Sequence, residues 1–333
     1  MVSGLPFDDI RGLLRALPAG DEVAAGNVAA IFSAAKRQSG SLGRLEEIAV
    51  WLARWSGRAP AVRRPLAAIF AGNHGVATHG VSPRAVEETA RAVELCAAGG
   101  APINGVCLAY DIGLKVFDLA LHLPTADITT DAALDERGCA ATIAFGMEAV
   151  AGGTDLLCIG HFGVGSSTVA AAMFAALFGG TGKDWVGPGS GTDVAMIARK
   201  AEIVDRALST HRGQLGDPLE VLRRLGGREF AAIAGAIIAA RTEHIPVILD
   251  GAAAIAAAAV LRGVNPDAVS HCMVAQRPVD PGTADAVSRL GLSPLLGVAI
   301  ASGDGTAAAL AAGIVKAAAS VATTLAEWRP VTT

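Results

Sequence analysis

Residues 155–178, DLLCIGHFGVGSSTVAAAMFAALF, contain the side chains and glycines of this chain best suited to binding an anion. The stretch reads as an apolar strand over 156–159, a loop with glycines at 160, 163 and 165, and a helix that begins at Ser166. Glycine lets the backbone approach a ligand, and the N–H groups and dipole of a helix start favour negative charge. We therefore predict a phosphate site that includes Gly163, Gly165 and Ser166. The alternative is an ordinary strand-to-helix connection.

A second glycine loop, 185–193 with the sequence WVGPGSGTD, precedes a helix that carries Arg199 and Lys200. Gly189 and Gly191 are candidates for close approach to the same anion, and Lys200 is a candidate cation for it. The simpler interpretation of the two basic residues is a solvated helix face.

The elements that would position these loops alternate between strands and helices. Apolar runs typical of buried strands begin at residue 66 and cover 114–121, 156–159, 245–251, 270–276 and 294–306. Helical patterns lie between them, at 87–98, 139–151, 168–178, 194–210, 218–225 and 229–241. This alternation predicts an α/β fold with a mostly parallel sheet flanked by helices.

Polar residues or glycines follow most of these strands. Parallel sheets bind ligands beyond the carboxyl ends of their strands, so these segments are expected to converge on one pocket. The segments are 72–75, 160–163, 250–251, 276–277 and 303–306.

Composition limits the classes of partner. Of the 333 residues, 52% are hydrophobic and 17% charged, and the net charge is −4, which gives no basic surface for nucleic acid or an anionic membrane. The apolar runs at 251–260 and 306–325 are short or rich in alanine, so we expect no membrane span. The five cysteines show no C-x-x-C pair, so we predict free thiols, no metal site and a cytoplasmic location.

Several motifs resemble those of one family, in the order in which that family has them. They include AIFAGNHGVATHGVS, GVGSSTVAAAMFAAL, VGPGSGTD, IPVILDG and GDGTAAAL. The chain is similar to nicotinate-nucleotide:dimethylbenzimidazole phosphoribosyltransferases over nearly its whole length. The resemblance implies a homodimer with a Rossmann-like domain, 63–306, and a small helical domain built from 1–62 and 307–333.

The resemblance also implies the reaction. Phosphoribose moves from nicotinate mononucleotide to 5,6-dimethylbenzimidazole or a related base, without a cofactor, giving α-ribazole phosphate and nicotinate. The family's catalytic glutamate, in a G-E-G-[ST]-G motif, corresponds here to Asp304 between Gly303 and Gly305. Its phosphate-side positions correspond to Gly163 and Lys200.

The sequence departs from the family at several pocket positions. A second family glutamate corresponds to His161, and a serine near the phosphate corresponds to Pro278, whose neighbour Arg277 could supply an anion contact instead. Asp304 is one methylene shorter than glutamate. The positions implied for the base pocket are Ser82, Arg91, Phe162 and Ser302.

These departures leave alternatives open. His161 is either a second catalytic residue, acting as a general base, or a polar cap in its loop. Asp250 is assigned to structure, and Asn73 and His74 either shape a turn or contact ligand. The protein as a whole is interpreted as a transferase, with an altered or inactive paralogue as the alternative. That paralogue would act as a ligand-binding protein or as one subunit of a hetero-oligomer.

Overall fold

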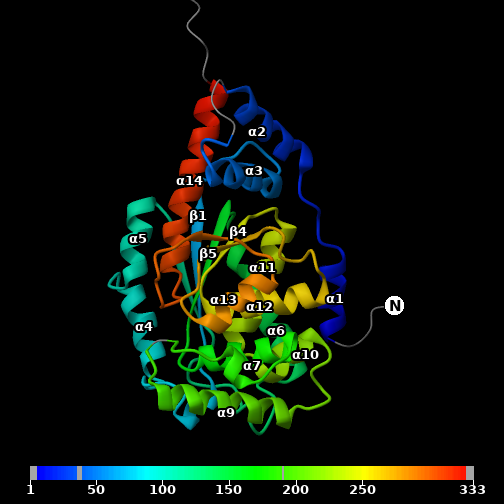
Figure 1. Ribbon diagram of the computed structural model, residues 1–333, viewed down its shortest axis with the longest axis vertical. Helices are drawn as coiled ribbons and strands as arrows, with labels where there is room; N and C mark the ends of the chain where they lie inside the picture. The colour runs from blue at the N-terminus through cyan, green and yellow to red at the C-terminus, as the bar shows by residue number, and fades with distance from the viewer. Residues whose placement is uncertain (1–5, 36–39, 190, 328–333) are drawn as a thin grey trace, which may run out of the picture.

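The computed structural model describes residues 6–35, 40–189 and 191–327. Its centre is a parallel sheet of six strands in the order β2-β1-β3-β4-β5-β6 (Figure 1). The predicted α/β class with a parallel sheet is confirmed. The strands are β1 (Pro65–Ala71), β2 (Gly113–Asp118), β3 (Leu156–Phe162), β4 (Val247–Leu249), β5 (Cys272–Gln276) and β6 (Pro294–Leu296).

Alternation along the strands divides the core into two layers. Leu157 and Ile159 of β3 pack on one face, in the layer formed with α6, α11 and α12. Leu156 and Cys158 pack on the other, against α14 and α5. Successive strand residues point to opposite faces, so an almost continuous apolar run is what a sheet covered on both sides requires.

The helices agree with the sequence pattern in most places, except that α5, α8, α12 and α13 were not predicted as helices. Residues 98–101 separate α4 from α5. The ranges are α4 (Glu88–Ala97), α5 (Pro102–Tyr110), α6 (Glu136–Met147), α7 (Ser166–Phe178), α8 (Gly182–Trp185), α9 (Val194–Thr210), α10 (Pro218–Leu225), α11 (Arg228–Thr242), α12 (Gly251–Val264), α13 (Pro281–Arg289) and α14 (Thr306–Glu327), with short 3-10 turns at Gly75–His79 and Glu148–Val150.

Small residues bring two of these helices unusually close. A methyl group added at Gly146 of α6 would contact the backbone of Ala232 in α11, and one added at Gly235 of α11 would contact the backbone of Ile143. The alanine and glycine content of the chain therefore serves close helix packing beneath the sheet.

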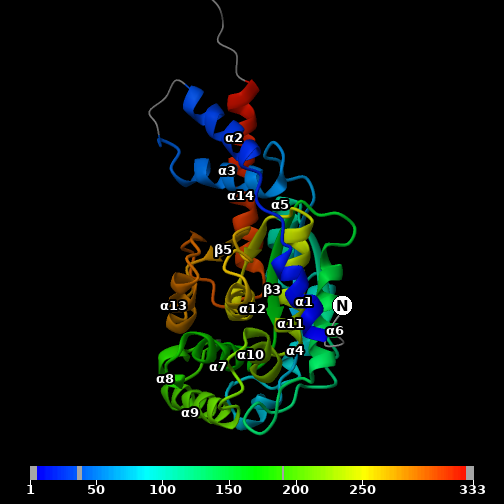
Figure 2. The same ribbon diagram turned by 90° about the vertical axis from the view of Figure 1, so that its right-hand side faces the viewer.

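Three helices from the two ends of the chain pack together at one end of the molecule (Figures 1 and 2). They are α2 (Glu22–Ala34), α3 (Arg44–Ser56) and the C-terminal part of α14. Residues 1–5, 36–39 and 328–333 of the predicted small helical domain lie outside the described residues. The domain boundaries themselves stay a prediction.

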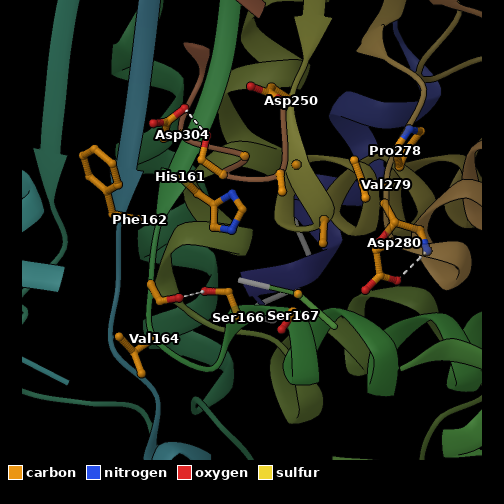
Figure 3. Close-up of a pocket in the computed structure, with 18 of the residues that line it drawn as sticks. His161, Phe162, Val164, Ser166, Ser167, Asp250, Pro278, Val279, Asp280 and Asp304 are labelled. Carbon is orange, nitrogen blue, oxygen red and sulfur yellow. Dashed lines mark hydrogen bonds between the residues drawn. The ribbon is translucent and has the colours of Figure 1, made fainter. Parts of the chain in front are cut away.

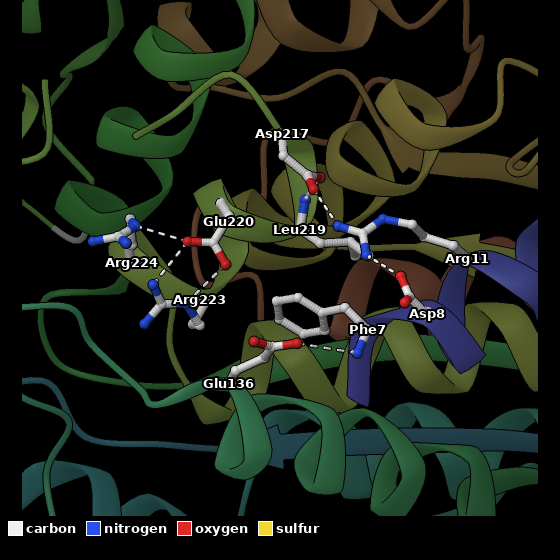
Figure 4. Close-up of polar contacts among 9 residues, drawn as sticks. All are labelled: Phe7, Asp8, Arg11, Glu136, Asp217, Leu219, Glu220, Arg223 and Arg224. Carbon is white, nitrogen blue, oxygen red and sulfur yellow. Dashed lines mark hydrogen bonds and ion pairs between the residues drawn. The ribbon is translucent and has the colours of Figure 1, made fainter. Parts of the chain in front are cut away.

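The first helix differs from that prediction. Helix α1 (Pro6–Arg15) packs on α6 and α12 of the α/β unit, away from α2 and α3. Arg11 pairs with Asp8 at 2.9 Å and with Asp217, which also caps α10 (Figure 4). Its buried residues Phe7, Ile10 and Leu14 give the helix one apolar face, and that face meets the larger core.

Two stretches are long and apolar enough to cross a membrane by length and composition, Glu88–Tyr110 and Thr306–Glu327. The first comprises two separate helices here, α4 and α5. The second is α14, and half of its most apolar window is buried within this fold. The packing of α14 on the sheet is that of a core helix in a globular protein.

Candidate active site

A cavity of about 330 Å³ opens at the carboxyl ends of β3, β4 and β5 (Figure 3). In the sheet order, β1 lies between β2 and β3. From β1 the chain first adds β2 on one side and then adds β3 and the later strands on the other side, so the topological switch point lies between β1 and β3. Open parallel sheets bind ligands at such a point. Four of the predicted strand-end segments reach the cavity, through His161 to Gly163, Asp250 and Gly251, Gln276, and Gly303 and Asp304.

One wall of the cavity is the turn before α14, whose backbone N–H groups donate hydrogen bonds to two carboxylates. Asp304 accepts hydrogen bonds from the Ser302 hydroxyl at 2.7 Å and from the Thr306 N–H at 3.0 Å. Asp250, at the end of β4, accepts from the N–H groups of Gly305 at 3.2 Å and Ala307 at 3.1 Å. Both carboxylates are thereby fixed at the start of a long helix, where the dipole favours negative charge.

The two carboxylates influence each other. Burial, and then repulsion from Asp304, raise the pKa of Asp250 to about 7, although backbone N–H groups oppose the shift. Asp250 is 3% exposed and Asp304 is 9% exposed. A carboxyl group with a pKa near neutrality beside a second carboxylate is typical of a functional site.

His161 packs against this turn. Its backbone N–H donates to the Gly303 carbonyl at 3.0 Å, and its ring packs between Gly251 and Gly303, both with positive φ. Among the described residues its Nδ1 has no hydrogen-bond partner. Burial lowers the pKa of His161, and repulsion from His74 adds to this, while Glu229 and Asp304 oppose it. The imidazole is therefore neutral and can offer one nitrogen to a ligand.

The opposite wall is the predicted anion turn. Gly165 caps α7 with φ of 93°, which glycine adopts readily, and Gly163, Ser166 and Ser167 line the cavity. The first N–H groups of a helix have no partner within the helix, so the start of α7 presents donors to this space.

Lys200 lies behind that turn and does not line the cavity. It is fully buried, and its ammonium group donates to the Ser167 hydroxyl at 3.1 Å and to the Gly187 carbonyl at 2.8 Å. Burial lowers the pKa of Lys200, and nearby Asp280 opposes the shift. Lys200 therefore does not contact a ligand in the cavity directly, and its charge acts across Ser167 and Gly189, which line the cavity.

A buried cluster supports the same turn from the other side. His74 Nε2 lies 2.6 Å from Glu229 Oε1, and the Ser166 hydroxyl donates to that oxygen at 2.9 Å. The side chains of His74 and Glu229 are 1% and 0% exposed. The segment 72–75, predicted to converge on the pocket, therefore lies one layer behind it.

The remaining surface of the cavity is largely apolar. It is lined by Val81, Ala92, Leu95, Ala101, Pro102, Phe162, Phe174, Trp185, Ile255 and Val274. Leu95 is 50% exposed, so the cavity reaches the surface beside it. Such a surface suits a planar aromatic ligand, with the polar groups fixing its orientation.

Ten of the fifteen residues predicted for the site line the cavity. They are Ser82, His161, Phe162, Gly163, Gly165, Ser166, Gly189, Ser302, Gly303 and Asp304. The other five, Arg91, Gly191, Lys200, Arg277 and Gly305, lie elsewhere.

The displaced residues have physical reasons for their positions. Arg277 is exposed, because the residue after Gln276 points to the opposite side of the extended chain. Arg91 is exposed on α4 and pairs with Glu88, one turn earlier in the chain. Gly191 has no atom near its Cβ position, and Gly305 turns inward against Ile69 while its N–H serves Asp250.

Sequence reasoning missed Glu229 and the role of Asp280. Glu229 is the one acidic residue in α11, whose other members are mostly apolar and buried, and it follows Gly226 and Gly227. An acid within such a helix was the available signal. Asp280 lines the cavity and caps α13.

Within the described residues, no three His, Cys, Asp or Glu side chains are grouped so that they could hold a metal ion.

Comparisons with known proteins agree with one another. Residues 17–330 match a family described as phosphoribosyltransferase. The chain is 58% identical, over 327 residues, to the nicotinate-nucleotide–dimethylbenzimidazole phosphoribosyltransferase of Allorhizobium ampelinum, covering 98% of this chain and 96% of that protein. It is 59% identical over 324 residues to the protein of that name from Sinorhizobium fredii, covering 96% and 94%.

Solved structures give the same relationship at lower identity. A nicotinate-nucleotide–dimethylbenzimidazole phosphoribosyltransferase from Thermus thermophilus superimposes with a TM-score of 0.84 at 31% identity, covering 91% of this chain and 96% of that one. CobT from the same organism superimposes with a TM-score of 0.85 at 32% identity, covering 90% and 96%.

Proposed function

The chain belongs to the nicotinate-nucleotide:dimethylbenzimidazole phosphoribosyltransferase family, and from that premise we propose that it transfers phosphoribose from nicotinate mononucleotide to 5,6-dimethylbenzimidazole or a closely related base. The observation that carries the proposal is one cavity that combines a helix N-terminus, an apolar wall and a fixed carboxylate. No finding favours the alternative of an inactive paralogue.

The donor phosphate binds at the turn before α7 in this proposal. The N–H groups at Ser166 and Ser167 supply hydrogen bonds, and Lys200 supplies a positive charge one layer behind. A buried cation is worth more than an exposed one, because water screens it less. Gly163 and Gly189 leave room for the phosphate oxygens to approach the backbone.

The acceptor base lies against the apolar wall near the mouth, next to Phe162 and Leu95. Aromatic faces stack on one another and on aliphatic side chains, which orients a planar base. Ser302 and Asp304 then meet its polar edge.

The chemistry is a displacement at C1′ with inversion. The lone pair of the base nitrogen forms the new C1′–N bond while the bond from C1′ to the nicotinate nitrogen breaks. The electron pair of the broken bond neutralises the pyridinium ring of the leaving nicotinate. The base loses its N–H proton to Asp304, so atoms and charge balance without a cofactor. Positioning and one general base supply most of the acceleration.

His161 has a smaller role in this proposal. Because burial keeps the imidazole neutral, it does not compete with Asp304 for the proton by charge. Its unpartnered Nδ1 instead accepts or donates one hydrogen bond to the ribose or the base.

We also propose that the protein works as a homodimer in the cytoplasm. Helices α4, α5 and α14 each expose an apolar residue, Leu95 at 50%, Leu108 at 86% and Ile314 at 36%, and α5 packs on α14. A second copy of the chain would cover this surface and close the mouth of the cavity beside Leu95. All five cysteines are free and buried, which agrees with a reducing compartment.

The test is turnover of the purified protein with nicotinate mononucleotide and 5,6-dimethylbenzimidazole, alongside a panel of benzimidazoles, purines and phenols. We expect nicotinate release and an α-ribotide of matching mass, with the highest kcat/KM for a benzimidazole. If no base gives product while a family enzyme run in parallel does, the proposal is wrong. Light scattering of the same sample measures the mass of the assembly.

A further inference from the structure

The buried pair of His74 and Glu229 has no part in the chemistry proposed above. The imidazole Nε2 donates to Glu229 Oε1 at 2.6 Å, and the Ser166 hydroxyl lies within reach of both, at 2.9 Å from Oε1 and 3.2 Å from Nε2. Ser166 is the first residue of α7 and lines the cavity. The pair is therefore joined directly to the anion turn.

Glu229 is an ionised carboxylate in the fully buried interior, where an isolated charge is ordinarily unfavourable. Burial alone raises the pKa of Glu229, but His74 and then His161 lower it by more, so its pKa is below the ordinary value. A fully buried carboxylate is costly unless it is paired and hydrogen-bonded. Its Oε2 has no partner among the described residues.

Glycines leave space for this carboxylate directly behind the turn. A methyl group added at Gly163 would lie 3.1 Å from Glu229 Oε1 and would contact the Ser166 hydroxyl. Methyl groups at Gly72 and Gly227 would contact the carboxylate from other sides. Three chain segments thus approach one acid, which fixes its position relative to the cavity wall.

We propose that His74 and Glu229 are positioning residues for the phosphate-binding turn. Glu229 holds Ser166, and through it the start of α7, in the geometry that aims the N–H groups at the phosphate. His74 donates a hydrogen bond to this carboxylate, so that its negative charge is held away from a phosphate bound on the far side of Gly163. The identity of that phosphate, the 5′-phosphate of nicotinate mononucleotide, rests on the proposed function.

The two residues differ in what their removal leaves behind, and this allows a sharp test. H74Q leaves an unpaired carboxylate behind the anion site, whereas E229Q removes the charge and keeps a hydrogen-bonding side chain. We expect H74Q to raise KM for nicotinate mononucleotide about 100-fold and E229Q about 10-fold, with KM for the base within about twofold. The double variant H74Q/E229Q, which is neutral, should recover most of the loss in H74Q.

A matched control separates positioning from general loss of stability. Asp155 is also buried and accepts two backbone N–H groups, from Arg63 at 2.7 Å and Arg64 at 2.9 Å, but at the opposite end of β3. D155N should lower the melting temperature and leave both KM values unchanged. Equal KM changes for donor and base in H74Q, or no recovery in the double variant, would overturn the proposal.

A binding assay with the milder variant S166A covers variants that fold poorly and keeps this inference separate from the proposed function. S166A removes only the hydroxyl that links Glu229 to α7, and it should weaken binding of ribose 5-phosphate, measured by calorimetry, about 10-fold. Unchanged binding in S166A and H74Q would contradict the inference. This binding assay needs no turnover, so it decides the point even if the transferase assay fails.

Discussion

Asp250 and Asp304 hold consecutive parts of the same turn. Asp250 accepts the N–H of Gly305 at 3.2 Å, and Asp304 accepts the N–H of Thr306 at 3.0 Å. The first carboxylate comes from the end of β4 and the second from the segment before α14, 54 residues later in the chain by the numbering. The position of the proposed general base is therefore fixed by the sheet as well as by its own loop.

The first prediction concerns Asp304. D304N keeps an oxygen that can accept from Thr306 but cannot take a proton from the base. We expect kcat to fall by about 10²–10⁴-fold with KM for nicotinate mononucleotide little changed. The melting temperature serves as the control and should stay close to that of the wild type. Unchanged turnover would remove Asp304 from the mechanism.

The second prediction concerns the pH dependence of stability. The pKa of Asp250 is raised from 3.8 to about 7, so the folded state binds the proton more tightly than the unfolded state. The stabilisation is complete below pH 3.8 and is lost as pH rises through about 7. D250N lacks this loss, so its stability relative to the wild type should rise by roughly 2–3 kcal/mol between pH 5 and pH 8. Urea unfolding at both pH values measures this, and a constant difference would contradict it.

The sequence predicts much of the fold because its signals are local. The run over 156–159 is apolar on both faces of β3, and helices such as α9 and α10 begin at aspartates, Asp193 and Asp217, that cap them. The docking of α1 was not predictable in this way. Its apolar face fits either core, and the partner depends on residues such as Asp217, more than 200 positions away.

The residues of the candidate site also fall into two groups, those marked by local sequence signals and those placed only by tertiary packing. Gly163, Ser166 and Asp304 follow strands or open helices, and the rule for strand ends places such residues together. Arg277 also follows a strand, but the direction of its side chain depends on where β5 ends within one residue. Glu229 follows no strand, and only the packed structure brings it to Ser166.

The third prediction concerns His161. Burial lowers the pKa of His161 below its ordinary value of 6.5, so we expect the imidazole to be mainly neutral across the assay range of pH 6.5 to 9. H161Q should lower kcat/KM by about 10-fold through loss of one hydrogen bond, with a pH profile of unchanged shape from pH 6.5 to 9. The measurement is kcat/KM over that range. Loss of a limb of the profile in the variant would instead identify His161 as a general base.

The fourth prediction concerns Lys200. Its ammonium group is buried and bonded to Ser167, so K200M removes both a charge and the support of the anion turn. We expect KM for nicotinate mononucleotide to rise about 10- to 100-fold, since hydrogen bonds to charged groups are stronger than neutral ones. K183M is the matched control, because Lys183 is exposed on α8. A similar effect in both variants would show that only net charge matters.

The last prediction separates the presence of a carboxylate from its position. D304E keeps the acid, but the extra methylene moves the carboxylate by roughly 1–1.5 Å and removes the short link from Asp304 to the Thr306 N–H. The bond from Ser302 can follow the longer side chain, whereas the backbone donor cannot. We therefore expect kcat to fall by about 10- to 100-fold, less than in D304N, with donor KM unchanged. Steady-state kinetics of the two variants side by side measure the order. If D304E is as active as the wild type, the turn before α14 does not fix the geometry of proton transfer, and if it is as inactive as D304N, position matters as much as charge.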